Sequence, residues 1–141
     1  MTERKYLPTI ADLIDRLSIS LMKSIFIPGF RQTYRSEMRL VMDDLASCFN
    51  DAKIAATPEG HVQLIYNCLV IMLANRYIWE NEALARKSGK GGRLRATHSV
   101  NGVRNLAKNK ISKHFGERID EKIDCLAADL PEDCGNWNVF E

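Results

Sequence analysis

The sequence predicts an all-α fold, an antiparallel bundle of four or five helices in a single domain spanning residues 1–141. Three observations predict this class. Apolar residues recur at intervals of three or four along most of the chain, which is the period of an amphipathic helix. Convincing strand-like alternation of apolar and polar residues is absent. The chain has 141 residues, of which 45% are hydrophobic and 27% charged, so it suits one hydrophobic core and is too short for two.

The first predicted helix begins with a capping box formed by Thr9 and Asp12. Its apolar face consists of residues spaced three or four apart, namely Ile10, Leu13, Ile14, Leu17, Leu21 and Ile25. Pro28 and Gly29 end this helix, because proline cannot continue the hydrogen-bond ladder and glycine favours a turn. A second helix follows, with its apolar residues at Phe30, Tyr34, Met38, Val41, Met42, Leu45 and Phe49.

The third predicted helix begins at Pro58, with Thr57 as its N-cap, and runs to about Lys87. Its expected core face holds Val62, Ile65, Leu69, Met72 and Leu73. The middle of this helix is apolar nearly all round, and we therefore expect it to be the central helix of the bundle.

A basic, glycine-rich segment at residues 88–97 predicts a loop. The fourth helix is expected to begin near Thr97 or Ser99 and to end at Gly116, with its core face at Val100, Val103, Ala107, Ile111 and Phe115. A fifth helix is expected from Ile119 to Leu130, before Pro131. Residues 131–141 are expected to be irregular, with Trp137 and Phe140 as anchors.

Composition also predicts the compartment. The longest apolar run, Cys68–Ala74, is far shorter than the roughly 18 residues of a membrane span. The amino end lacks the apolar stretch of an export signal, so we expect a cytoplasmic protein that does not contact membranes. The four cysteines are then expected to be free thiols. The cysteine and histidine spacings match no metal site, and we expect neither a metal nor another cofactor.

The net charge of +2 is unevenly distributed along the chain. Residues 86–118 contain ten Lys or Arg and one acid, a balance of +9, whereas residues 119–141 contain one Lys and seven acids, a balance of −6. A basic block of this density attracts phosphates and other anions. The alternative is a solvated face that is neutralised by the acidic segment.

Two polar stripes lie beside the expected core faces. The stripe on the third helix contains Asn75, Trp79, Glu82 and Arg86, and the stripe on the fourth contains Asn101, Arg104, Asn105 and Lys108. We expect these stripes to converge on one half-buried cleft, with Glu82 paired to Arg104. Arg93 and Arg95, in the neighbouring basic loop, complete the candidate ligand-binding residues.

The stripes resemble the Asn-x-x-x-Trp-x-x-Glu…Arg and Asn-x-x-Arg-Asn signatures of a helical domain family of unknown function. Such domains occur in bacterial polysaccharide gene clusters and phage genomes. Residues 11–19 are also similar to the opening of related phage and glycosyltransferase-associated proteins. Ala83 stands where the family often has an acid, which argues against a two-carboxylate metal role. The resemblance implies a helical fold with a polar centre and brings no established activity.

The candidate residues have two interpretations. They could form an internal network that only fixes the helix register, because buried polar groups often satisfy one another. The excess of cationic donors over the single carboxylate of Glu82 favours a phosphate site, with Trp79 or Tyr77 stacking on a base. We therefore expect a non-enzymatic binder of a small phosphorylated ligand, such as a nucleotide or cyclic nucleotide signal. It would be a homo-oligomer through the first two helices, and if phage-encoded it would act on a host signalling pathway in the host cytoplasm.

Two other function classes remain open. One is a magnesium-dependent nucleotide pyrophosphohydrolase, which needs several acids on facing helices. The candidates fit poorly, since Glu80 and Glu82 point to different faces, and Asp12 and Asp15 are expected on an exposed face beside Arg16. The other is a nucleic-acid or protein-binding module that uses the basic segment 86–118.

Overall fold

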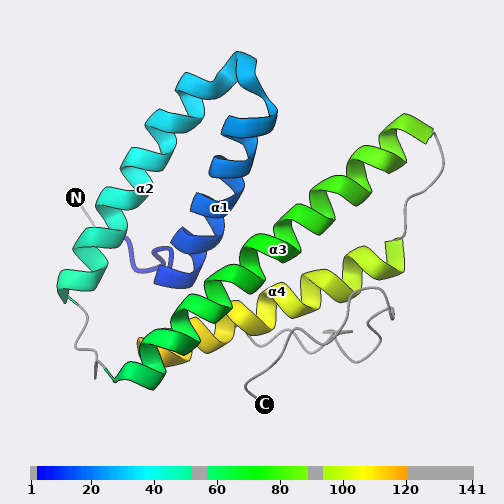
Figure 1. Cartoon of the computed structure of the whole chain (residues 1–141). Helices are drawn as coiled ribbons and strands as arrows, with labels where there is room; N and C mark the ends of the chain where they lie inside the picture. The colour runs from blue at the N-terminus through cyan, green and yellow to red at the C-terminus, as the bar shows by residue number, and fades with distance from the viewer. Residues whose placement is uncertain (1–2, 52–56, 89–93, 121–141) are drawn as a thin grey trace.

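The computed structural model describes residues 3–51, 57–88 and 94–120 (Figure 1). These residues form four α-helices and contain no strand, which confirms the all-α prediction. The helices are α1 (Ile10–Phe26), α2 (Arg31–Asp51), α3 (Pro58–Ser88) and α4 (Leu94–His114). Ile119 and Asp120 are not helical, and the remainder of the expected fifth helix, like residues 131–141, lies outside the described residues.

The helices are arranged as two antiparallel hairpins, α1–α2 and α3–α4 (Figure 1). Helix α1 is the element shared between them, because it packs on α2 and also contacts α3 and α4. The 3-10 helix Pro28–Phe30 makes the turn of the first hairpin. An ion pair between Arg16 and Glu37 fastens α1 to α2.

The helix starts follow the predicted capping chemistry. The Asp12 N–H donates to Thr9 Oγ1 over 3.1 Å, and the Thr9 N–H donates to Asp12 Oδ2 over 3.0 Å, so the capping box is complete. At the start of α3, the Gly60 N–H donates to Thr57 Oγ1 over 3.0 Å. Both predicted starts are confirmed, because local side chains satisfy the N–H groups that a helix start leaves unpaired.

The start of α4 differs from the prediction. The helix begins at Leu94, before Thr97, so the expected loop 88–97 is too long at both ends. Ser88 belongs to α3, and of the expected loop residues 89–93 lie outside the described part of the chain. Leu, Arg and Ala are among the best helix formers, which explains why residues 94–96 extend the helix upstream of Thr97.

The main core lies where α1 meets the other three helices. Its buried residues are Ile10, Ala11, Leu13, Val41, Leu45, Val70, Ile71, Val103, Ala107 and Ile111. The predicted core face of α3 is wrong: Val62, Ile65, Leu69 and Leu73 are all exposed, and Val70, Ile71 and Ala74 are buried instead. Helix α3 carries apolar residues on two opposite faces, and α1 and α4 cover the face that the sequence pattern did not favour.

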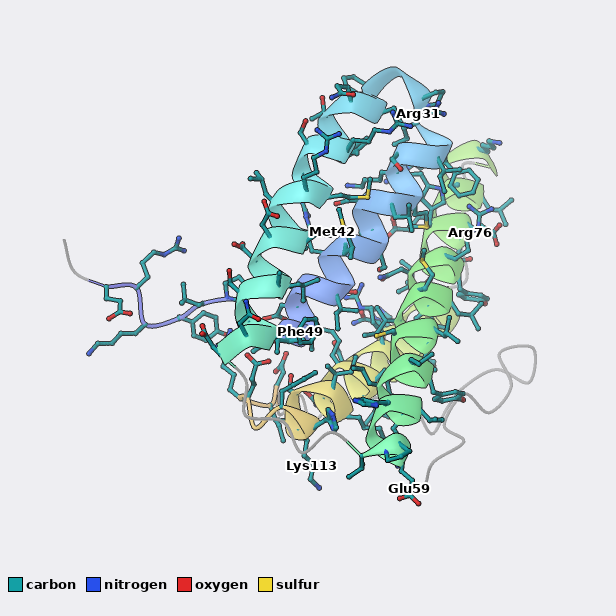
Figure 2. All side chains as sticks on the ribbon, turned by 60° about the vertical axis from the view of Figure 1, so that its left-hand side comes forward. Arg31, Met42, Phe49, Glu59, Arg76 and Lys113 are labelled. Atoms are coloured by element: carbon teal, nitrogen blue, oxygen red, sulfur yellow. The ribbon has the colours of Figure 1, made fainter. Side chains whose placement is uncertain are left out.

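Four apolar residues of the first hairpin are less buried than their sequences predict. Leu21 and Ile25 of α1 are exposed, as are Met42 and Phe49 of α2 (Figure 2). Buried serines, Ser18, Ser20 and Ser24, lie on the packed side of α1 instead. Their small side chains allow close approach of the neighbouring helices, and two of them donate to backbone carbonyls of their own helix.

No helix in the described residues is long and apolar enough to cross a lipid bilayer. Cys48 and Cys68 are free thiols, as predicted, and Cys125 and Cys134 lie outside the described residues. Burial raises the pKa of both described thiols, and the nearby Glu117 carboxylate adds to this for Cys48. Because the thiolate is the reactive form, both cysteines behave as packing residues.

Candidate functional site

A buried amide, Asn75 of α3, joins three helices. Its Nδ2 donates to Asp15 Oδ1 over 2.9 Å and to Ser18 Oγ over 2.7 Å, both on α1. Its Oδ1 accepts from Nη1 of Arg104 on α4, also over 2.9 Å. The side-chain donors and acceptor of Asn75 are all used, so this residue fixes the register of α1, α3 and α4.

A second polar cluster lies one helical turn towards the start of α1. Lys108 Nζ is 3.0 Å from Asp12 Oδ1 and 3.9 Å from Asp15 Oδ2. Arg118 Nη2 is 3.6 Å from the other oxygen of Asp12. Asp12 therefore lies between two cations from the other end of the chain. Partial burial raises the pKa of Asp12, but the Thr9 N–H and the Lys108 ammonium outweigh this and hold it below its ordinary value of 3.8.

The turn after α4 positions Arg118 and its neighbour Glu117. Gly116 has φ 67°, the left-handed conformation that glycine adopts at helix ends. The Gly116 N–H donates to the Lys113 carbonyl and the Glu117 N–H donates to the Ser112 carbonyl, which is the Schellman arrangement. The turn directs Glu117 towards α1, where its Oε1 accepts from the Ile10 N–H over 2.8 Å. Glu117 thus supplies the anion that a helix N-terminus favours.

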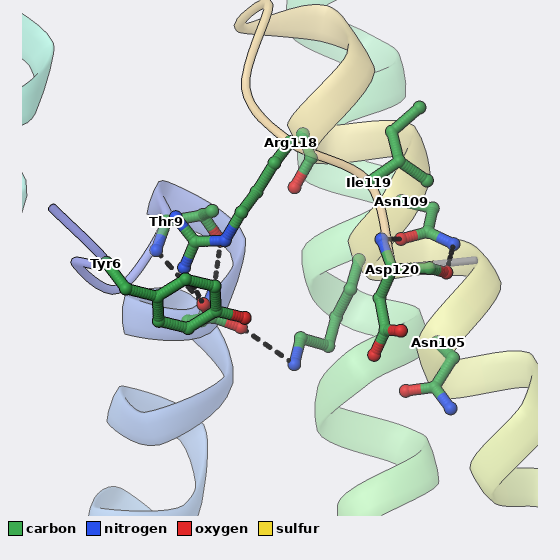
Figure 3. Close-up of a pocket in the computed structure, with 10 residues that line it drawn as sticks. Tyr6, Thr9, Asn105, Asn109, Arg118, Ile119 and Asp120 are labelled. Carbon is green, nitrogen blue, oxygen red and sulfur yellow. Dashed lines mark hydrogen bonds and ion pairs between the residues drawn. The ribbon is translucent and has the colours of Figure 1, made fainter. Parts of the chain in front are cut away.

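These contacts frame a pocket of about 300 Å³ between the start of α1 and the end of α4 (Figure 3). Figure 3 shows Tyr6 and Thr9 on one wall and Asn105 and Asn109 on the other, with Arg118 between them. The lining residues are Tyr6, Thr9, Asp12, Asn105, Lys108, Asn109, Ser112, Arg118, Ile119 and Asp120. The pocket offers two cations, two carboxylates, hydroxyl groups and an aromatic ring within one small volume.

Two interactions keep the walls of this pocket in place. Asn109 donates from Nδ2 to the Asp120 carbonyl over 2.8 Å and accepts from the Asp120 N–H over 3.1 Å. The Arg118 guanidinium stacks on the Tyr6 ring, 3.9 Å from its centroid, and donates to the Leu7 carbonyl. Asn109 is therefore committed to the backbone, and the groups with remaining hydrogen-bond capacity are the side chains at the centre.

The predicted convergence of the two stripes occurs in part. Asn75 and Arg104 are bonded to each other, and Lys108 and Asn105 follow along α4, where both line the pocket. Asn101 is half-buried one turn earlier on α4. The predicted ion pair of Glu82 with Arg104 is wrong, because Glu82 pairs with Arg86 over 3.9 Å on exposed α3 surface.

The other predicted residues lie elsewhere. Trp79 lines a separate hollow with Phe26 and Ala83, on a different side of α3 from the pocket. Arg93 lies outside the described residues, and so does the side chain of Arg95. The expected loop therefore contributes no described group to the pocket.

Sequence reasoning missed the acidic half of this site. Asp12 and Asp15 were expected on an exposed face, yet the structure directs both towards Lys108. The capping box predicts that Asp12 lies at the start of α1, but its contact with Lys108 depends on how α4 packs against α1. Tyr6, Ser112 and Arg118 were missed too, since they belong to no repeating pattern.

The structure leaves fewer cationic donors without a partner than the sequence suggests. Arg104 and Lys108 of the basic segment 86–118 contact Asn75 and Asp12 instead of forming an exposed basic face. Within the described residues, no group of three or more His, Cys, Asp or Glu side chains could hold a metal ion. One donor is left over: Arg104 Nε is buried, with no hydrogen-bond partner among the described residues.

Comparisons with protein-family models, curated proteins and solved structures gave no match.

Proposed function

We propose that the protein binds a small phosphorylated ligand, such as a nucleotide, in the pocket between α1 and α4, without altering it chemically. One observation carries the proposal: Lys108 and Arg118 converge on a pocket of about 300 Å³ with Asp12 between them, and Asp15 is also 3.9 Å from Lys108. This volume lies at the lower end of the range for small-molecule sites. An ammonium and a guanidinium each carry several N–H donors, so both cations can also donate to a phosphate.

The remaining lining groups suit the other parts of a nucleotide. The Tyr6 ring offers a flat surface beside the Arg118 guanidinium, on which a base can stack. Asn105 can donate or accept at a base edge, and Asp120 can accept from ribose hydroxyls or a base amino group. The lining therefore mixes cations with hydroxyl, amide and aromatic groups, which favours a nucleotide over inorganic phosphate.

Calorimetric titration of the full chain with a panel of nucleoside mono- and triphosphates and cyclic nucleotides tests the proposal. We expect binding by at least one member at ~1 mM or below, which corresponds to a modest affinity. The substitution Lys108→Gln should weaken it roughly tenfold or more, since a charge-assisted contact to phosphate is lost. The matched control is Lys113→Gln, an exposed lysine of the same helix outside the pocket.

Two results would count against the proposal. One is a folded protein that gives no heat with any nucleotide of the panel at that concentration. The other is binding that Lys108→Gln and Lys113→Gln weaken equally, which would indicate attraction to general positive charge. Circular dichroism of Lys108→Gln verifies that loss of the ion pair between Lys108 and Asp12 has not unfolded the junction of α1 with α4.

A further inference from the structure

The outer face of α3 carries a row of exposed apolar side chains. Ile65, Leu69 and Leu73 are 61%, 63% and 52% exposed, whereas Ile71 on the opposite face is fully buried. A helix with apolar residues on opposite faces is normally covered on both. The described helices cover only one face of α3, and Figure 2 shows the helix at the edge of the bundle, with Glu59 at its amino end.

The spacing of the outer face is that of a coiled coil. Side chains recur at alternating intervals of three and four, and we name this row the α3 seam: Val62, Ile65, Leu69, Met72, Arg76, Trp79, Ala83 and Arg86. This is the a/d pattern with which two helices pack side by side. Helix α3 has 31 residues, so it is about 46 Å long and can present four heptads. The partner that fits this pattern is another helix.

The two halves of the α3 seam have complementary shapes. The amino-terminal half projects large aliphatic side chains, Val62, Ile65 and Leu69. The carboxyl-terminal half contains a hollow of about 340 Å³, lined by Phe26, Arg76, Trp79, Glu80, Ala83, Leu84 and Lys87. Arg76 lies at the edge of this hollow. Its Cζ is 4.0 Å from the centroid of the Phe26 ring, and its Nη2 is 2.7 Å from Glu80 Oε1. The projecting half of one α3 therefore matches the hollow half of another that runs in the opposite direction.

We propose that the α3 seam binds the same seam of a second copy of this chain, as a symmetric antiparallel two-helix coiled coil centred near Leu73. In this register Ile65 lies opposite Ala83 of the second copy, and Leu69 lies opposite Trp79 of the second copy. In these two layers a large aliphatic side chain meets a small one or an aromatic ring, which is knobs-into-holes packing. In the other two layers Val62 and Met72 lie against the aliphatic stems of Arg86 and Arg76 of the second copy. Because the dimer is symmetric, each of these contacts occurs twice, as in any isologous interface.

Charge favours the same orientation. Glu59 and Lys87 flank the seam at equivalent heptad positions near its two ends. The antiparallel register places Glu59 opposite Lys87 of the second copy, twice in the dimer. A parallel register would instead place Arg76 and Arg86 of the seam beside their own equivalents, and like charges at these positions repel.

Sedimentation equilibrium and light scattering of the full chain test the proposed surface. We expect a dimer whose association weakens roughly tenfold or more in Leu69→Glu, because a carboxylate would be buried in a core layer. The matched control is Leu40→Glu, which changes a leucine that is 67% exposed on α2. Both positions are exposed, so neither variant should unfold the chain, and circular dichroism verifies this.

A second pair of experiments tests the orientation. Glu59→Lys and Lys87→Glu should each weaken the dimer, by roughly twofold to fivefold at low salt, and the double variant should recover. Leu73→Cys should form a disulfide between residues 73 of two copies under mild oxidation, identified by peptide mapping. Val62→Cys should give no such link, because the register places the two copies of residue 62 at opposite ends.

The outcomes that overturn the proposal are distinct. A chain that is monomeric at all concentrations overturns it, whether or not another part of the chain covers the seam. A dimer that Leu40→Glu and Leu69→Glu affect equally has a different interface. Crosslinking through residue 62 but not 73 would contradict the antiparallel orientation.

Discussion

Arg104 donates from Nη1 to Asn75 Oδ1 over 2.9 Å, and through this bond a guanidinium on α4 holds the amide that ties α3 to α1. The same Arg104 has a buried Nε without a hydrogen-bond partner among the described residues. A half-satisfied cation is costly unless its remaining bonds are good. The Asn75 contact is therefore the most sensitive polar interaction of the helix junction.

The substitution Asn75→Ala should destabilise the protein by about 2–4 kcal/mol, because it removes the hydrogen bonds that Asp15, Ser18 and Arg104 make to a buried amide. Urea unfolding followed by circular dichroism measures this change. The control Asn50→Ala alters an exposed amide at the end of α2 and should stay within about 0.5 kcal/mol of the parent. Equal effects at both positions would show that the Asn75 network contributes nothing.

The pKa of Asp12 predicts acid sensitivity. Its folded pKa lies below the ordinary value of 3.8, so its contribution to stability is present above that value and is lost as the pH falls through the folded pKa. The free energy of unfolding, measured by urea titration between about pH 6 and pH 3, should therefore decrease towards the acid end. Asp12→Asn should be less stable at pH 6 and show a shallower decrease. Parallel curves would mean that Lys108 and Thr9 do not stabilise the carboxylate.

Gly116 adopts a positive φ that other residues accommodate with strain. Gly116→Ala should cost about 1–2 kcal/mol and should loosen Glu117 from the start of α1. Gly116→Asn should cost less, because asparagine tolerates this conformation better. Thermal unfolding measures both. Gly29→Ala is the control, since a Cβ there meets no atom within 4 Å and its φ is not positive.

Gly60 marks a close approach between the start of α3 and the end of α4. A Cβ at Gly60 would lie 2.7 Å from Cε1 of His114, so Gly60→Ala should be destabilising by about 1 kcal/mol despite the better helix propensity of alanine. In a His114→Ala background the same change should cost less, because the closest contact is removed, although Thr57 Oγ1 still lies 3.0 Å from the added Cβ. A double-mutant cycle from urea unfolding measures this coupling. No coupling between positions 60 and 114 would contradict the predicted contact.

Local chemistry allowed much of the fold to be predicted from the sequence. Thr9, Pro58 and Gly116 each act on backbone within a few residues of themselves, and all three mark helix ends in the structure. The core face of α3 could not be predicted in this way. Periodicity identifies an apolar face, but a helix with two such faces does not specify which one its own chain will cover.

The candidate site was predictable only in halves. Asn75, Arg104 and Lys108 were identified because polar residues beside a core face need partners. The acidic residue predicted to join them, Glu82, is wrong, and Asp15 takes that place. Sequence spacing puts an acid on one face of its own helix, but it does not give the angle at which two helices pack, and this angle determines which acid is close. Whether a ligand joins this network is the question that the nucleotide titration answers.

The bond from Ile10 to Glu117 spans 107 residues of sequence. At a synthesis rate of roughly 5–20 residues per second, the carboxylate that caps α1 emerges from the ribosome roughly 5–20 seconds after the helix it caps. The first hairpin is complete at Asp51 and waits for the later part of this period before α4 packs on α1. The surface of α1 that α3 and α4 later cover carries Asp12, Asp15 and Ser18, which water can hydrate until their protein partners arrive.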